Sequence, residues 1–458
     1  MTEFLSKSFE RFILRGTSTV KGLLHYIIQY WDPNQFAVPG ASCAHALIKL
    51  IDFILVSTDD CTKPTAVVNL LADWSKAFNK CNHNIIMRIL VAMNVPMWLL
   101  RLILSYLEAR RMIVRFRGCS SHPKELPGGM PQGTLLGVIL YILYINPIGF
   151  PSEITLEISD TVHEYWKTLH TFPPTTTSSA TLPPTVQCVK FMDDATVQEA
   201  VNLTTSLVPS NTSSAKILPK ENTLIQTQLN ELKQISDCRE MTLNNEKTCL
   251  LIVNFSVNHQ FEPQIQIPGC QKSLNILSET KILGYWLTED MKTNRHIEHI
   301  LKISYKRIWA ISKLSKAGIH PKDIIHFFNV KIRSVLESSC PVFHSMITKE
   351  QSNDIERLQK ILLRIILKDS YKSYEQACKS FAILTLEQRR KQLCLKFALR
   401  ILENKKFKDF FTLNINTNNV RKQEKFIVPF ARTSRYKNSP KVFLTRLLNE
   451  HFQNNPTT

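Results

Sequence analysis

The run from Thr65 to Asp73 is the feature that most constrains the fold of this chain. Its sequence, TAVVNLLAD, is apolar at nearly every position and ends in an aspartate. A short, continuous apolar run of β-prone residues is typical of a strand buried on both faces of a sheet. Helical patterns lie on either side of it, at 44–56, 83–92 and 97–109. We therefore expect a central strand, covered by helices, with a carboxylate at its end.

Downstream, two β-prone segments bracket the pair Asp193 and Asp194, which predicts a β-hairpin with the acids at its tip. The stretch at about 171–185 is uncharged and rich in Thr, Ser and Pro, so we expect a disordered surface loop there. Further helices are expected at 3–30, 222–238, 293–316, 321–337, 350–368 and 386–404, and further strands at 112–117, 248–255, 263–267 and 281–287. The class is therefore α+β, with a mixed block to about residue 290 and a helical block after it.

The net charge of the chain indicates a class of binding partner but does not by itself indicate a function. The 458 residues hold 57 Lys and Arg against 38 Asp and Glu, a formal net charge of +19, which favours a polyanionic partner. Residues 387–458, the C-terminal tail, concentrate this excess, with 16 Lys and Arg against 5 Asp and Glu and aromatic residues between them. A nucleic-acid surface and a solvated helical face over core phenylalanines explain the tail equally well. The candidate nucleic-acid contacts are Arg389, Arg390, Lys391, Lys405, Lys406 and Lys408.

Nothing in the sequence predicts secretion or a membrane span. The uncharged run at 126–152 is broken by prolines, which leaves about 13 helical residues where a span needs about 20. We interpret it as a buried core helix. The eleven cysteines have no C-x-x-C spacing, and the N-terminus has no signal-peptide pattern. An intracellular protein, nuclear or cytoplasmic, with reduced thiols is expected; its oligomeric state stays open.

Three polar features occur in an order that suggests chemistry. Asp73 ends the buried strand, a Pro-Gln-Gly turn at 131–133 precedes the apolar helix, and Asp193 and Asp194 occupy the hairpin tip. Carboxylates from neighbouring strand ends are the ligands that a pair of hard divalent cations requires. Taken singly, each feature is ordinary turn chemistry, as we interpret the pair Asp59 and Asp60. Their order makes a shared cation site the stronger hypothesis.

Several longer segments, in the same order along the chain, extend these features: LSKSFER at 5–11, DWSKAFN at 73–79 with Asn82 and His83, GMPQGTLLG at 129–137, FMDD at 191–194, LNNEKT at 243–248, KILG at 281–284 with His296 and Ile297, and CPVFH at 340–344. Together they resemble the boxes of non-LTR (LINE-like) retrotransposon reverse transcriptases over nearly the whole chain. The resemblance implies a right-hand polymerase palm with partial fingers (1–290), then an all-helical thumb (291–386) and a basic helical C-terminal region (387–458).

The same resemblance implies an RNA-directed DNA polymerase that uses an RNA template, a DNA primer, deoxynucleoside triphosphates and Mg²⁺ or Mn²⁺. Asp73, Asp193 and Asp194 would be the catalytic metal ligands, and Lys247 would lie near the leaving pyrophosphate. Phe78 would exclude a ribose 2′-hydroxyl, and Gln132 and Gly133 would line the nucleotide pocket. The alternatives are that Phe78 is a plain core residue and that Lys247 is a solvated charge.

The sequence departs from the family pattern in ways that leave two hypotheses open. Asn79 replaces the usual second aspartate of the first box, Trp74 adds bulk beside Asp73, and the stretch at 171–185 resembles an insertion. The basic fingers segment and an endonuclease would lie upstream of Leu5, so we expect an N-terminally truncated chain without an endonuclease domain. One hypothesis is an active polymerase; the other is an inactive relic that binds nucleic acid.

Overall fold

A five-stranded sheet forms the centre of the molecule. The computed structural model describes residues 2–60, 62–75, 77–108, 110–126, 128–145, 185–203, 208–209, 216–217, 224–256, 263–414 and 424–454. The strands of the sheet are β1 (Thr65–Ala72), β6 (Val186–Phe191), β7 (Asp194–Asn202), β10 (Cys249–Asn254) and β11 (Asn275–Leu277). Their order is β11-β10-β1-β7-β6, with only β10 and β11 parallel. The predicted buried central strand and the predicted hairpin are therefore confirmed.

The alternating side chains of β1 divide the hydrophobic core in two. Ala66, Val68 and Leu70 face a cluster that includes α8 (Leu224–Cys238), while Val67 faces a second cluster on the other side. Alternate residues of a strand point to opposite faces, so a strand apolar at almost every position must be covered twice. In the second cluster, the long helix α3 (Cys43–Ser57) lies against the sheet.

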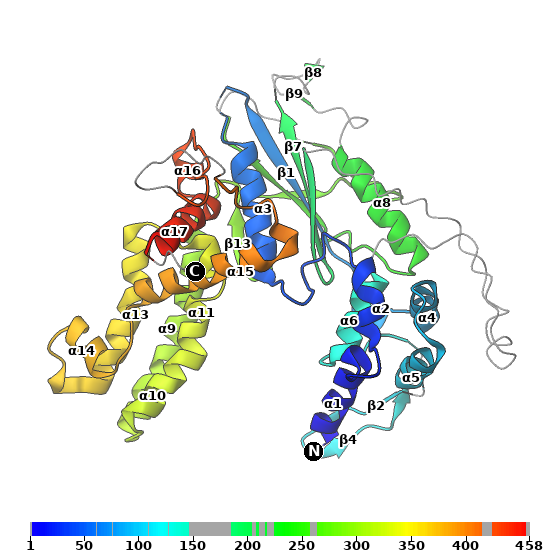
Figure 1. Ribbon diagram of the computed structural model, residues 1–458, viewed down its shortest axis with the longest axis horizontal. Helices are drawn as coiled ribbons and strands as arrows, with labels where there is room; N and C mark the ends of the chain where they lie inside the picture. The colour runs from blue at the N-terminus through cyan, green and yellow to red at the C-terminus, as the bar shows by residue number, and fades with distance from the viewer. Residues whose placement is uncertain are drawn as a thin grey trace, which may run out of the picture.

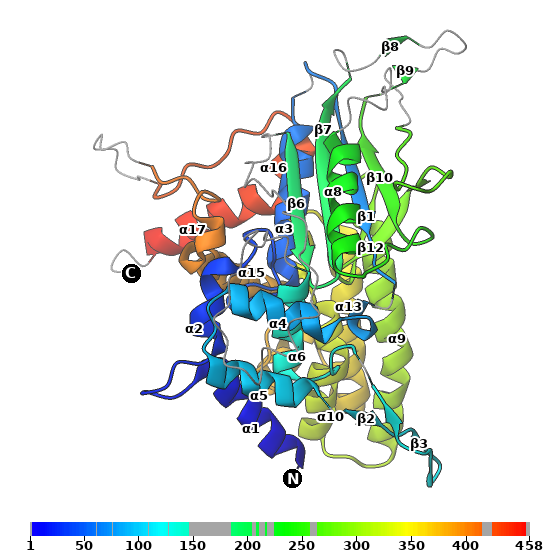
Figure 2. The same ribbon diagram turned by 90° about the vertical axis from the view of Figure 1, so that its right-hand side faces the viewer.

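An N-terminal arm extends from one end of the sheet (Figures 1 and 2). The expected helix at 3–30 is interrupted, because Gly16 adopts a positive φ of 75° and the chain turns back through a bridge to Lys21. The expected strand at 112–117 is two short, exposed strands that pair with different partners. The arm consists of α1 (Thr2–Arg15), α2 (Leu23–Ile27), α4 (His83–Ala92), α5 (Met97–Leu107), β2 (Arg111–Met112), β3 (Arg115–Phe116), β4 (Cys119–Ser120), β5 (Lys124–Glu125) and α6 (Leu135–Tyr144).

The apolar run near residue 140 is the core helix that the sequence predicts. Helix α6 has ten residues, and most of them are buried. Its first turn is capped by the Thr134 side chain and by the buried carboxylate of Glu10, which accepts hydrogen bonds from Leu135 and Leu136. Across the described part of the chain, we find no helix with the length and apolar character needed to span a bilayer.

Helices dominate the chain from α9 onwards and form a second, helical arm. Its elements are α9 (Asn294–Lys316), α10 (Pro321–Phe328), α11 (Ser334–Leu336), α12 (Cys340–Phe343), α13 (Lys349–Leu367), α14 (Tyr374–Ser380), α15 (Leu386–Glu403), α16 (Ser434–Lys437) and α17 (Pro440–Asn454), preceded by the hairpin β12 (Glu279–Ile282) and β13 (Tyr285–Thr288). The expected helix at 321–337 is broken by a π-helical turn, and the expected strand at 281–287 is part of this hairpin. The segment at 263–267 forms a single bridge, at Gln266.

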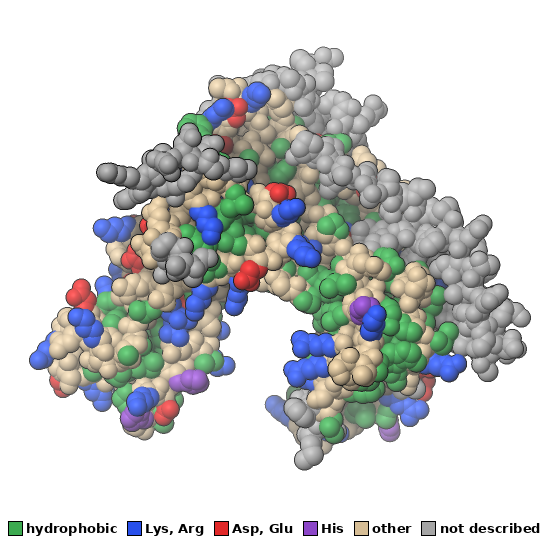
Figure 3. All heavy atoms as spheres, in the orientation of Figure 1, with side chains coloured by type: hydrophobic (Ala, Val, Ile, Leu, Met, Phe, Trp, Pro, Cys, Tyr) green, Lys and Arg blue, Asp and Glu red, His purple; other side chains and the backbone are tan. Residues whose placement is uncertain are grey.

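The two arms enclose an open cleft, with the sheet at its closed end (Figure 3). The space-filling view shows Lys and Arg side chains along the inner edges of both arms. In Figure 1 the β6–β7 turn points towards the cleft. The α+β prediction, a palm-like sheet followed by a helical region, is confirmed. The domain boundaries at 290 and 386 stay predictions, and the second core cluster runs across both of them. Of the predicted loop at 171–185, all but Thr185 lies outside the described residues.

Candidate active site

Asp73 and the pair Asp193 and Asp194, which are far from Asp73 in the sequence, lie at the same end of the sheet. β1 pairs with β7 through its last residue, Ala72, which lies opposite Ala195. Continuing this register by one residue places Asp73 opposite Asp194. Asp193 lies in the turn between β6 and β7, where Phe191 and Asp194 close the hairpin. We call Asp73, Asp193 and Asp194 the acid edge.

The carboxylates of the acid edge interact electrostatically. Burial, together with the charges of Asp193 and Asp73, raises the pKa of Asp194 to about 6. Burial also raises the pKa of Asp193, as does the charge of Asp73, whereas its own backbone N–H and the charge of Lys247 lower it. Carboxylates that disfavour one another's ionisation are close together, and they are stabilised when a cation binds between them.

The LNNEKT segment holds Asp73 from the side opposite the hairpin. The amide of Asp73 donates to Thr248 Oγ1 at 3.3 Å, and its carbonyl accepts from the amide of Asn244 at 2.8 Å. Lys247 Nζ lies 3.8 Å from Asp73 Oδ2. Trp74, by contrast, points into the first core cluster and donates to Ser236. The expectation that Trp74 adds bulk beside Asp73 is therefore wrong, because consecutive residues of an extended chain face opposite sides.

The donor set of the acid edge fits a divalent cation. Asp73 Oδ2 is buried and accepts no hydrogen bond, since Lys247 is too distant to donate one. An unsatisfied buried carboxylate oxygen is costly unless a cation binds it. Within the described ranges, no three His, Cys, Asp or Glu side chains are already gathered into a metal-binding cluster. Asp73 instead faces the ammonium group of Lys247, and both side chains are exposed enough to move.

The predicted nucleotide-pocket segments lie beside the first box. The carbonyl of Phe78 accepts from the amide of Met130 at 2.7 Å, and the carbonyl of Cys81 accepts from Gly129 at 2.8 Å. Gly129 has a positive φ of 82°, and a Cβ there would lie 2.9 Å from the Asn79 carbonyl, so glycine is needed for this close approach. Gln132 and Gly133 follow in the exposed turn before α6.

Phe78 is half-buried and stacks on Tyr141 of α6, with ring centroids 3.9 Å apart and an interplanar angle of 20°. Tyr141 is fully buried, and its hydroxyl has no hydrogen-bond partner. Burial raises the pKa of this hydroxyl above its usual range, and the charge of Asp193 raises it further. Tyr141 carries no sequence signal of its own, because it occupies one position of a uniformly apolar run. The Tyr141 ring packs against the ring of Phe78, and Tyr141 lies close enough to the acid edge for the charge of Asp193 to act on it.

The six candidate nucleic-acid contacts of the tail occupy different environments. Arg390 is buried and donates to Ser352, Arg389 pairs with Glu337, and Lys391 pairs with Glu450 at 3.0 Å. Lys406 is half-buried and donates to two backbone carbonyls of the segment at 32–33.

Lys405 and Lys408 are exposed, and no ion pair involving either lysine is found in the described part of the chain. Most of the aromatic residues interleaved with these charges are buried. The buried ones are Phe397, Phe407, Phe410, Phe411, Phe426 and Tyr436. For these rings the structure favours the core interpretation over stacking on bases.

Comparison with known families and proteins gives consistent matches. A family model described as "Reverse transcriptase (RNA-dependent DNA polymerase)" matches residues 17–287, which is more than half of the chain. Two Drosophila melanogaster proteins are each 31% identical to it: a probable RNA-directed DNA polymerase from transposon X-element, over 150 residues, and one from transposon BS, over 153 residues. Each match covers 32% of this chain but only 15% and 16% of those proteins.

Solved telomerase structures are also similar to the chain. The apo enzyme from Candida tropicalis has a TM-score of 0.36 at 10% identity, covering 82% of this chain and 53% of that one. The Candida albicans enzyme, solved with a fragment of telomeric RNA, has a TM-score of 0.33 at 12% identity, covering 84% and 59%.

Proposed function

The chain belongs to the reverse transcriptase family, and we propose that it is an RNA-directed DNA polymerase that extends a primer 3′-hydroxyl with deoxynucleotides. The resemblance to non-LTR, LINE-like retrotransposon enzymes is confirmed by the family match and the two transposon relatives. The observation that carries the proposed activity is the acid edge, where β1 and β7 pair through Ala72 and Ala195, the direct neighbours of Asp73 and Asp194. An RNA template and a DNA primer are the proposed occupants of the cleft, whose inner edges carry Lys and Arg (Figure 3).

Asp73, Asp193 and Asp194 are the residues that would hold Mg²⁺ or Mn²⁺. A pair of such cations, when bound, activates the primer hydroxyl and offsets the charge of the triphosphate. Lys247 belongs to the same constellation, since its charge already acts on Asp73 and Asp193. With cations on the carboxylates, its ammonium group would be available to the leaving pyrophosphate, where it would stabilise the developing negative charge.

Phe78 is proposed to select deoxynucleotides. Its ring is fixed by stacking on the rigid, buried Tyr141, so it cannot move aside for an additional hydroxyl group without disturbing the core. Gln132 and Gly133 lie in a turn whose backbone is anchored to the first box through Gly129 and Met130. This turn is proposed to form the opposite wall of the nucleotide pocket.

A primer-extension assay tests the proposal. Purified chain, given oligo(dT)-primed poly(rA), dTTP and Mg²⁺, is expected to incorporate label, and Asp193→Asn is expected to abolish incorporation because it removes one cation ligand. Asp59→Asn alters an acid whose side-chain hydrogen bonds, in the described part of the chain, come from Arg432 and Thr433 of the tail, and it is expected to keep the activity. Equal incorporation by wild type and Asp193→Asn would overturn the proposal. So would no incorporation by a folded wild-type chain that still binds primed RNA, which is the behaviour of an inactive relic.

A further inference from the structure

The segment at 32–36 lies along the free edge of β6 and continues the sheet beyond its named strands. The amide of Lys190 donates to the carbonyl of Asn34 at 2.8 Å, and the amide of Phe36 donates to the carbonyl of Lys190 at 2.7 Å. Gln35 therefore forms a parallel bridge with Lys190. The segment and the hairpin are about 157 residues apart in the sequence, so this contact is set only by the tertiary fold.

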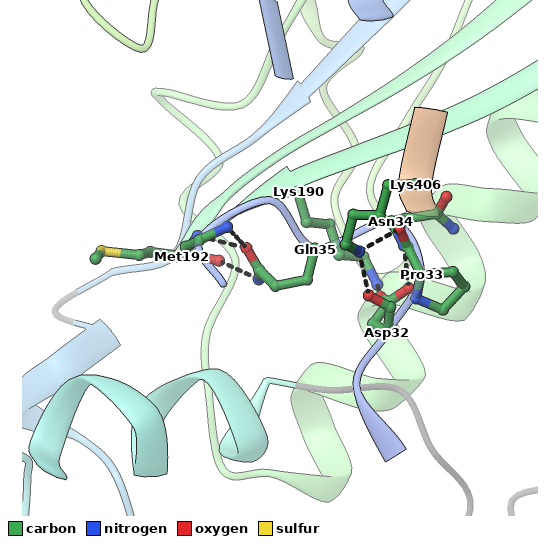
Figure 4. Close-up of polar contacts among 8 residues, drawn as sticks. Asp32, Pro33, Asn34, Gln35, Lys190, Met192 and Lys406 are labelled. Carbon is green, nitrogen blue, oxygen red and sulfur yellow. Dashed lines mark hydrogen bonds and ion pairs between the residues drawn. The ribbon is translucent and has the colours of Figure 1, made fainter. Parts of the chain in front are cut away.

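Gln35 uses its side-chain amide to hold the turn that carries Asp193. Its Oε1 accepts from the amide of Met192 at 3.0 Å and from the amide of Ala37 at 3.0 Å, and its Nε2 lies 3.5 Å from the carbonyl of Met192 (Figure 4). The Gln35 residue is 2% exposed, so the bond that it accepts from Met192 is shielded from water.

The turn at Met192 needs a hydrogen-bond partner such as Gln35 to keep its conformation. Met192 has a positive φ of 53°, a left-handed conformation that costs a side-chain-bearing residue about 1–2 kcal/mol. Its amide proton would lose its partner if Gln35 were removed, because the Gln35 side chain is the acceptor that the described hydrogen bonds give it. Without the two contacts that Gln35 makes with the amide and the carbonyl of Met192, the turn would relax towards a negative φ at Met192. This change would shift the carboxylate of Asp193, the next residue.

Two charged contacts fix the segment that supplies Gln35. Lys190 Nζ pairs with Asp32 Oδ2 at 2.8 Å, with both side chains at least nine-tenths buried. Lys406, from the tail, donates to the backbone carbonyls of Asp32 at 3.3 Å and Pro33 at 2.6 Å (Figure 4). These contacts connect the tail, the segment and β6 in one chain of direct polar interactions.

We propose that Gln35 is a positioning residue, which holds the Met192 turn in its left-handed conformation and so fixes Asp193 for cation binding. Lys406 supports it by anchoring the segment at 32–34. The role is conformational, since the Gln35 side chain contacts backbone atoms of the turn and none of the three carboxylates in the described contacts. The inference rests on the proposed function for its consequence in catalysis, but the hold on the turn is measurable without catalysis.

Hydrogen exchange by mass spectrometry, on peptides that contain the Met192 amide, tests the hold directly. Gln35→Met has the same length and no amide, so it removes both contacts with Met192; we expect exchange at this position to become about tenfold faster, as for the loss of one hydrogen bond. Gln35→Glu keeps the acceptor oxygen and is expected to keep exchange slow. Gln359→Met is the matched control, because Gln359 is equally buried and amide-bonded but lies in α13.

Mn²⁺ binding, followed by electron paramagnetic resonance, tests the consequence. Gln35→Met is expected to weaken Mn²⁺ binding about tenfold, and Lys406→Met less, while Gln359→Met leaves it unchanged. Unaltered exchange at Met192 in Gln35→Met, or equal Mn²⁺ affinity in Gln35→Met and Gln359→Met, would overturn the proposal. If Gln35→Met does not fold, Gln35→Asn, whose amide is one methylene too short, replaces it under the same criteria.

Failure of the proposed function is separable from failure of this inference. A wild-type chain that binds Mn²⁺ through the acid edge but extends no primer would overturn the polymerase assignment and leave the role of Gln35 to be decided by the exchange and Mn²⁺ measurements. A wild-type chain that extends primers, with a Gln35→Met variant that exchanges and binds Mn²⁺ normally, would overturn only the role of Gln35.

Discussion

The acid edge and the C-terminal tail both contain candidate functional residues, but these candidates rest on different kinds of signal. Asp73, Asp193 and Asp194 were predicted from motif order, and the strand register brings their segments together. The tail candidates rest on composition, and several of their charges are used within the protein, as Arg390 and Lys406 illustrate. Net charge counts side chains without saying where they point, whereas ordered motifs separated by β-prone segments specify a topology.

The largest expected effect tests whether an aspartate of the acid edge matters more for activity than an aspartate that contacts the tail. Asp73→Asn removes one negative charge and a proposed cation-ligand oxygen from the acid edge, so we expect primer extension to fall at least about 10³-fold. Asp60→Asn changes a partly exposed acid that pairs with Arg432 of the tail, and extension should stay within about twofold. Comparable losses in the two variants, measured as kcat/KM, would remove the distinction.

The next effect tests whether the tail is part of the folded core. Asp59 accepts hydrogen bonds from the amides of Arg432 and Thr433 and from the Thr433 hydroxyl, at 2.7–2.9 Å. Asp59→Ala leaves these donors without their acceptor, and the free energy of unfolding should fall by about 3 kcal/mol in urea denaturation. Asp290→Ala, which removes bonds within one exposed loop, should cost less. An unchanged Asp59→Ala midpoint would mean that the tail is not docked.

The bonds to Asp59 also make tail docking sensitive to acid. Burial raises the pKa of Asp59, but the amides of Arg432 and Thr433 and the Thr433 hydroxyl outweigh it, so the pKa lies below the ordinary value. A lowered folded-state pKa means that this contribution is complete above the unfolded pKa, about 3.9, and is lost as pH falls through the folded value. The wild-type chain should therefore lose stability relative to Asp59→Ala only below about pH 4.

His45 of α3 makes the packing of the tail on α3 sensitive to pH in a higher range than Asp59 does. Its ring packs on Phe397 and Phe407 of the tail, and burial, together with the charge of Arg400, lowers its pKa to about 4. The unfolded chain binds a proton near pH 6.5, so stability is lost as pH falls from 6.5 towards 4, by about 2 kcal/mol at pH 5. His45→Gln should show a correspondingly flatter dependence of unfolding free energy on pH. If the unfolding free energy of the wild type and of His45→Gln depended on pH in the same way, His45 would not be held neutral by burial in the folded chain.

The smallest effect separates exposed from buried charges within the tail. Lys405→Gln with Lys408→Gln should weaken binding of primed RNA a few-fold at low salt and reduce the salt slope by about one to two, because both lysines are exposed. Arg390→Met should leave both quantities unchanged, and should not destabilise the chain, because two of the Arg390 guanidinium nitrogens have no hydrogen-bond partner. A larger loss of RNA binding in Arg390→Met than in the double lysine variant would favour the hypothesis that the whole basic tail is a nucleic-acid surface.

Much of the palm-like half could be predicted from sequence, because its signals are local. The apolar run before Asp73, the hairpin around Asp193 and the proline-bounded helix near residue 140 each carry their own pattern. Gln35, Tyr141 and the burial of Arg390 could not be predicted in this way. Their roles depend on partners more than 30 residues away, and no periodicity or motif in the neighbouring sequence records those contacts. The interrupted helices at 3–30 and 321–337 show the same limit at element boundaries.

The central claim is that Asp73 and the Asp193 turn bind the same cations, and iron-directed cleavage measures this most directly. Fe²⁺ that replaces Mg²⁺ generates short-lived oxidants with ascorbate and peroxide, and these cut the backbone close to the bound ion. We expect two cleavage positions, near residue 73 and near residues 192–194, both suppressed by excess Mg²⁺ and both lost in Asp193→Asn. Cleavage at one position alone, or cleavage near residue 73 that persists in Asp193→Asn, would contradict it.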